Sequence, residues 1–124
     1  MATLDLDQNP ASYQVRAFRP GAIQINDKVL TRSIIITPNQ LIENWAPQTV
    51  NELAVTDLAP MIALKPDVLL IGTGSQFVIL SVDLYGDLIN LGIGVEIMDT
   101  GAACRTYNAL SSENRNVVAA LIIR

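Results

Sequence analysis

The sequence predicts a single α/β domain in which parallel strands alternate with helices in the second half of the chain. Half of its 124 residues are apolar and only 16% are charged, which suits one domain with a substantial core. Ile34–Ile36 and Val68–Ile71 are short apolar runs rich in β-branched residues, typical of strands buried on both faces. Leu84, Leu88 and Leu91 recur at helical spacing, which predicts an amphipathic helix between two strands.

The first half of the chain favours antiparallel hairpins. Tyr13–Phe18 alternates between two faces in the way that a strand does. Ala22–Ile25 and Val29–Leu30 flank Asn26-Asp27, two residues that tolerate positive φ, so a β-hairpin is expected. Residues 1–12 are expected to form a flexible N-terminal arm, and residues 13–124 the α/β domain.

The middle of the chain is predicted to contain one strand and two helical segments. Ser33–Thr37 is expected to form a buried strand, and Gln40–Trp45 one helical turn. A longer helix starts at Thr56-Asp57, or at Pro60 if that proline takes the first helical position, and continues to about Leu64.

Strands and helices then alternate. Val68–Ile71 is expected to be a central strand, while Phe77–Leu80 is open between a short strand and a lead-in to the next helix. That helix begins after Ser81 and ends before Gly92, and Val95–Met98 is the next strand.

The last helix and strand complete the predicted domain. Thr100 is expected to cap this helix, in which Ala103, Tyr107 and Leu110 share a face. Asn114 suits a left-handed turn before a last strand, Val117–Ile123.

Composition excludes several classes of function. Eight Lys and Arg against twelve Asp and Glu leave a net charge of −4, which argues against nucleic-acid binding. The chain has no histidine, so His-dependent metal sites and Ser-His or Cys-His nucleophile pairs are excluded, and no metal or cofactor is expected. Met1–Pro10 has no secretory pattern, and no apolar run reaches the roughly 18–20 residues of a membrane span. A cytoplasmic protein is therefore expected.

An ordered set of motifs points to a known family. These motifs are Pro66-Asp67, Gly72-Thr73-Gly74, Gly92–Thr100, Ala103–Asn108 and Glu113-Asn114-Arg115. Together they resemble the domain-of-unknown-function family 498, which includes a mitochondrial assembly factor for respiratory complex I and an adipogenesis-associated domain protein. The chain departs from the family at Asn114, where glycine is usual, but asparagine also tolerates a left-handed turn.

The resemblance implies a three-layer domain, with a central mixed sheet between helices on both faces and an antiparallel hairpin contribution. It provides no proven catalytic residues that could be transferred to this chain. For the mitochondrial members it implies a scaffold or assembly role.

Gly72, Thr73 and Gly74 form the first candidate site. They follow a buried strand, where doubly wound folds place ligand crevices, and exposed N–H groups there could bind an anion. The string fits neither a dinucleotide fingerprint nor a Walker motif, because it lacks the third glycine and the lysine. A structural tight turn is the favoured interpretation.

Charged residues of the second half form the second candidate site. The carboxylates of this region are Glu96, Asp99 and Glu113. Asp99 and Thr100 lie where a strand meets a helix, and two carboxylates near one crevice could serve as an acid and a base. The favoured interpretation is a helix cap and a structural ion-pair network, in which Arg105 and Arg115 neutralise the carboxylates.

Three side chains of the last helix and one tryptophan have both a structural and a functional interpretation. Cys104 is expected to be a packed, inert thiol rather than a reactive one. Tyr107 and Asn108 could line a crevice, but a tyrosine in the core with a satisfied hydroxyl is favoured. Trp45 either anchors its loop to the core or contacts a partner.

Two functions remain after these exclusions. The first is a non-catalytic interaction or assembly module that binds a protein partner, for which a second copy of the chain (a homodimer) is one option. The second is a protein that binds a small molecule or anion, including an enzyme, with a crevice between Gly72–Gly74 and Asp99–Arg105.

Overall fold

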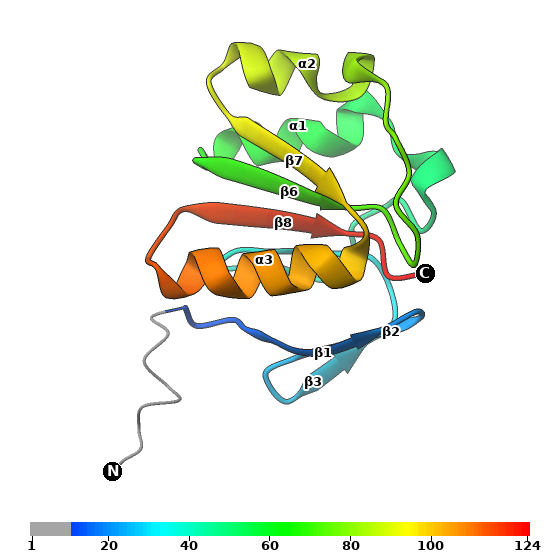
Figure 1. Ribbon diagram of the computed structural model, residues 1–124, viewed down its shortest axis with the longest axis vertical. Coiled ribbons are helices and arrows are strands. Elements are labelled where there is room, and N and C mark those ends of the chain that lie inside the picture. Colours follow the sequence, from blue (N-terminus) through cyan, green and yellow to red (C-terminus); the bar gives the residue numbers. More distant parts are fainter. Residues whose placement is uncertain (1–10) are drawn as a thin grey trace.

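A five-stranded mixed sheet forms the middle layer of the structure (Figure 1). The helices α1 (Val55–Ala63) and α2 (Val82–Asn90) cover one face of this sheet. The other face is covered by α3 (Thr100–Ser112) together with a separate three-stranded sheet. This computed structural model describes residues 11–124, so nearly all of the arm expected at residues 1–12 lies outside the described residues. The predicted three-layer α/β architecture is confirmed.

The strands fall into two groups along the chain. The small sheet has the order β1 (Val15–Arg19), β2 (Ala22–Ile25) and β3 (Lys28–Leu30). The central sheet has the order β5 (Leu41–Ile42), β4 (Ile34–Ile36), β8 (Val117–Leu121), β6 (Val68–Gly72) and β7 (Gly94–Met98). A short 3₁₀ helix, η2 (Val50–Glu52), precedes α1.

Parallel pairing in the middle of the central sheet follows from the β-α-β connections. β6 pairs in parallel with both β7 and β8, because α2 and α3 return the chain to the same end of the sheet. β4 pairs antiparallel with β8, which makes the sheet mixed. Every residue of β4, β6 and β8 is buried, as expected for strands with a covered layer on each face.

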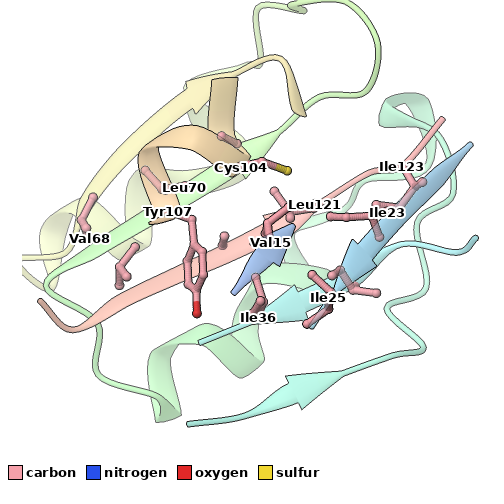
Figure 2. Packing of buried hydrophobic residues seen from close by; sticks show 14 residues of the cluster. Val15, Ile23, Ile25, Ile36, Val68, Leu70, Cys104, Tyr107, Leu121 and Ile123 are labelled. Carbon is pink, nitrogen blue, oxygen red and sulfur yellow. The ribbon is translucent and has the colours of Figure 1, made fainter. Parts of the chain in front are cut away.

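Alternate side chains of these strands enter two separate cores. On the α3 side, Val68 and Leu70 belong to one buried cluster with Tyr107 of α3 and with Ile23 and Ile25 of the small sheet (Figure 2). On the other side, the intervening strand residues, such as Leu69 and Ile71 of β6, form a second cluster with α1 and α2. The helices contribute Leu58, Met61 and Leu88 to this cluster. Burial of one such side chain stabilises the fold by roughly 1.5–3 kcal/mol, so both layers are held mainly by apolar contact.

The predicted hairpin is confirmed and forms a sheet of its own. Asn26 has a φ of 52°, and its side-chain oxygen accepts a hydrogen bond from the Gln14 N–H at 3.1 Å. Val15, Ile23 and Ile25 point into the core beneath α3, so the hairpin packs across the central sheet instead of extending it. Asn114 also has the expected left-handed conformation, with a φ of 61°.

The helical turn predicted for Gln40–Trp45 is wrong, because this stretch contains strand β5. The Thr37 hydroxyl accepts hydrogen bonds from the N–H groups of Asn39 and Gln40, at 3.1 and 2.9 Å. These bonds form a tight turn that folds β5 back onto β4 as an antiparallel pair. Trp45 is buried, and its indole N–H donates to the Asp57 carbonyl at 3.1 Å, so it anchors the loop.

Side-chain hydrogen bonds cap the N-terminal ends of α1 and α2. Asp57 accepts a hydrogen bond from the Ala54 N–H at 2.8 Å, and the Ser81 hydroxyl accepts one from the Asp83 N–H at 3.3 Å. The alternative start of α1 at Pro60 is wrong, because this proline lies inside the helix. Residues 77–80 form neither strand nor helix and serve as the lead-in to α2.

We predict that Gly72→Ala lowers the free energy of unfolding by roughly 1–3 kcal/mol, because it overpacks the contact between β6 and α3. An added Cβ at Gly72 would lie 2.7 Å from the Thr100 Oγ1 and 3.0 Å from the Thr100 Cα. Gly86→Ala is the control, since a Cβ there meets nothing within 4 Å and alanine favours the helix by about 1 kcal/mol. Urea denaturation measures both variants, and equal midpoints for the two would count against the close contact.

Candidate functional site

The first candidate site lies where β6, β7 and β8 end beside the start of α3, on the right in Figure 1. The buried Thr100 hydroxyl accepts a hydrogen bond from the Gly74 N–H at 2.9 Å and donates one to the Ile122 carbonyl at 2.6 Å. The Thr100 N–H in turn donates to the Gly74 carbonyl at 2.9 Å. The Gly72–Gly74 turn, α3 and the last strand are therefore joined at a single side chain.

The backbone N–H groups of this turn already have partners within the chain. Thr73 donates to the Met98 carbonyl and Ser75 to the Arg124 carbonyl, each at 2.9 Å, while Gly74 donates to Thr100. The Thr73 hydroxyl donates to the Gln76 carbonyl at 2.7 Å. An anion here would have to displace these bonds, so the geometry favours a structural turn.

The cap of α3 is Asp99, which corrects the prediction for Thr100. A carboxylate oxygen of Asp99 accepts a hydrogen bond from the Ala102 N–H at 2.9 Å. Thr100 is instead the first helical residue, and its side chain faces inward, away from the helix start. The half-buried Asp99 therefore serves the helix terminus, where a negative charge is also favoured by the helix dipole.

The predicted ion-pair network is absent, and this part of the interpretation is wrong. Among residues 11–124 the structure shows one ion pair, between Lys28 and Glu43. Glu96, Arg105 and Arg115 are exposed and make no ion pair with one another or with any other described residue. Arg115 follows the C-terminal end of α3, whose thirteen residues place it roughly 20 Å from the Asp99 end. The two arginines therefore do not share a site.

A shallow hollow of about 200 Å³ between β1 and α3 does bring some of the candidates together. It is lined by Arg16, Phe18, Cys104, Arg105 and Asn108, among others. The Asn108 amide is already engaged, because it accepts from the N–H of Val15 at 3.0 Å and donates to its carbonyl at 2.8 Å. The hollow therefore offers exposed guanidinium groups but no free, oriented polar partner from Asn108.

Tyr107 and Cys104 lie in the core, as the structural interpretation predicted. The Tyr107 hydroxyl donates to the Tyr13 carbonyl at 2.7 Å, and burial raises the pKa of this tyrosine above its ordinary value. Burial likewise raises the pKa of the Cys104 thiol to about 12, although the nearby Arg105 acts in the opposite direction. The thiol is protonated at neutral pH and cannot serve as a ready nucleophile.

The most conspicuous surface feature was missed at the level of sequence. We define the helical layer as α1 together with residues 75–91, which include α2 and the loop before it. Among the described residues, eight of the ten exposed large hydrophobic side chains belong to this layer: Val55, Ile62, Phe77, Val78, Ile79, Val82, Ile89 and Leu91. The Phe-Val-Ile run at 77–79 was the signal that could have revealed it, because exposed apolar clusters mark interaction surfaces.

The chain matches one protein-family model over most of its length. The family model described as "Protein of unknown function (DUF498/DUF598)" matches residues 15–122. The chain belongs to the DUF498/DUF598 family. The resemblance found in the sequence motifs is thereby confirmed.

Proteins that are similar in sequence to this DUF498/DUF598 chain have different names. NADH dehydrogenase (ubiquinone) 1 alpha subcomplex assembly factor 3 of Danio rerio is 32% identical over 114 residues. The match covers 90% of this chain and 65% of the zebrafish protein, so the chain spans about two thirds of that relative. The "13 kDa major membrane protein" of Francisella tularensis is 26% identical over 123 residues, which cover 98% of this chain and 100% of that protein.

The fold is shared with solved structures. A crystal structure of a Bordetella parapertussis protein superposes with a TM-score of 0.86 and 36% sequence identity, over 92% of this chain and 98% of that chain. In the described part of this chain, no helix has the length and apolar character needed to cross a membrane.

We predict that Thr100→Val lowers the free energy of unfolding by about 2 kcal/mol. Valine keeps the shape of the side chain but leaves the Gly74 N–H and the Ile122 carbonyl without partners in the core. Arg105→Ala, on the same helix, should change the free energy of unfolding by no more than about 0.5 kcal/mol, because Arg105 is exposed and forms no ion pair within the described part of the chain. Urea melts of the two variants compare the contributions directly, and a larger effect at Arg105 would restore the structural role first expected for it.

We predict that Cys104 reacts slowly with a thiol reagent in the native protein and quickly in denaturant. Folding raises the pKa of the Cys104 thiol from 9.0 to about 12. The contribution of this thiol to the free energy of unfolding is therefore complete below pH 9 and is lost as the pH rises towards 12. Cys104→Ala should therefore make the loss of stability above pH 9 less steep. Equal reaction rates in the native and unfolded protein would overturn the buried assignment.

Proposed function

We propose that this chain is a non-catalytic interaction module that assembles with a protein partner through its helical layer. The observation that carries the proposal is the concentration of exposed apolar side chains on that layer. Ile79 is 84% exposed, Phe77 56% and Val82 58%, although such residues are normally buried. Large exposed apolar patches mark protein–protein or membrane contacts in soluble domains.

Packing within the domain does not explain why residues 77–79 are apolar, because their side chains face outward. Residues 77–79 lie in the connection that runs from the end of β6 to the start of α2, along the right side of Figure 1. Leu80, next in the chain, is buried in the core and fixes the connection to the domain. The three preceding side chains are thus held outward on an anchored loop, which suits contact with another molecule.

The relatives support a role in assembly. The zebrafish relative is named as an assembly factor, and the name implies contact with other protein subunits. The candidate crevice for a small molecule has less support, because the N–H groups at Gly72–Gly74 and the Asp99 carboxylate are engaged in structural hydrogen bonds. An interaction module is therefore the function that the geometry favours.

The test is a pull-down from the native cell extract with the wild-type chain and two variants. We expect Ile79→Ser to lose the captured partner, because it removes the most exposed apolar side chain of the helical layer. Val29→Ser is the matched control, since Val29 is 60% exposed but lies on β3, in the opposite layer. Thermal unfolding of both variants should match the wild type, so that loss of folding does not explain the result.

Two outcomes decide the proposal. A partner retained by the wild type and by Val29→Ser but lost by Ile79→Ser supports docking on the helical layer. Capture that is the same for all three proteins would contradict it, as would the absence of any specific partner in the extract.

A further inference from the structure

The helical layer differs from the rest of the molecule in charge as well as in exposed apolar area. Within α1 and residues 75–91 the charged residues are Asp57, Asp83 and Asp87, and there is no Lys or Arg. The wider chain shows the same bias, because Lys65 is the only basic residue between Ser33 and Cys104. The surface proposed for docking is therefore both apolar and acidic.

On α2, helical spacing places exposed apolar side chains beside exposed carboxylates. Val82, Gly86 and Ile89 follow one another at i, i+4 and i+7, so they form an apolar stripe on the exposed side. Asp83 and Asp87 are each one residue further along and form an exposed acidic stripe beside it. A Cβ at Gly86 would meet nothing within 4 Å, so a partner can approach the helix closely at this point.

Charge decides between the occupants of this surface. Two copies packed through α2 would bring Asp83 and Asp87 of both chains together, and α1 and residues 75–91 contain no Lys or Arg to offset them, which is unfavourable. A second copy could instead offer its basic layer, where Arg16, Arg19 and Arg105 are exposed. That layer, however, exposes only Val29 among the large hydrophobic side chains of the described residues, so it could not cover the apolar stripe. An anionic membrane would repel the carboxylates.

We infer that the partner segment that docks on α2 is an apolar stretch flanked by Lys or Arg, such as an amphipathic basic helix. Its apolar side chains cover Val82 and Ile89, and its cations lie against Asp83 and Asp87. This inference rests on the proposed function, and it adds the chemistry of the partner. Complementary charge at the rim of an apolar contact sets which partner binds more than how tightly it binds.

Two synthetic amphipathic helices with the same leucine face test the inference, one with lysine and one with glutamate at the remaining positions. Fluorescence anisotropy of the labelled peptides should show that the lysine peptide binds at least about tenfold more tightly. The double variant Asp83→Asn/Asp87→Asn should weaken binding of the lysine peptide by about tenfold, the effect of removing two partly exposed charge pairs. The control Asp27→Asn/Glu113→Gln removes the same net charge from exposed positions in the opposite layer and should leave the affinity within about twofold.

The outcomes separate this inference from the proposal on which it rests. If the two double variants bind the lysine peptide equally, or if the glutamate peptide binds as well, the basic partner is ruled out. The apolar docking surface still stands in that case, provided that Ile79→Ser loses the captured protein. A dimer in size-exclusion chromatography that Ile79→Ser dissolves would instead identify a second copy as the occupant. Sedimentation with anionic vesicles would identify a membrane, and either result overturns the inference.

Discussion

The buried hydroxyl of Thr100 is the contact on which the arrangement of the layers depends. It accepts from the Gly74 N–H and donates to the Ile122 carbonyl, so it fixes the first turn of α3 against the ends of two parallel strands. This approach requires Gly72, where any Cβ would collide with Thr100. Once α3 is placed, its Asn108 amide binds the backbone of Val15 and thereby positions the small sheet. The contacts of one buried hydroxyl thus orient α3, and α3 orients the hairpin.

The same contact explains why the strand ends do not form an open crevice. In many parallel α/β sheets, ligands bind beyond the carboxyl ends of the strands. Here the Ser75 N–H donates to the Arg124 carbonyl, and a Cβ at Gly74 would lie 2.5 Å from that oxygen. Arg124 therefore occupies the space next to the turn. The connection to α2 passes outside it and directs Phe77 and Ile79 away from the core.

The two outer layers of the domain have different surfaces. The layer of α1 and α2 is apolar and acidic, whereas the layer of α3 and the small sheet contains Arg16, Arg19 and Arg105. A fold shared with a Bordetella parapertussis protein and with relatives of different names does not by itself specify a function. Within such a family, the exposed side chains of the outer layers are the part of the structure that can select a partner without disturbing the two cores.

Local sequence determined those strands and turns whose local conformational preference agrees with the tertiary packing around them. The β-branched run at Ile34–Ile36 and the positive-φ turns at Asn26 and Asn114 were predictable, because each depends on residues close in the chain. The strand β5 was not, since its few residues are strand only when the turn at Thr37 pairs them with β4. Tertiary structure alone decided that Arg105 forms no ion pair with the carboxylates of residues 11–124, and that the apolar residues 77–79 face outward. Composition and spacing specify which side chains are apolar or charged, but only the packing of distant segments decides which of them remain in contact with solvent.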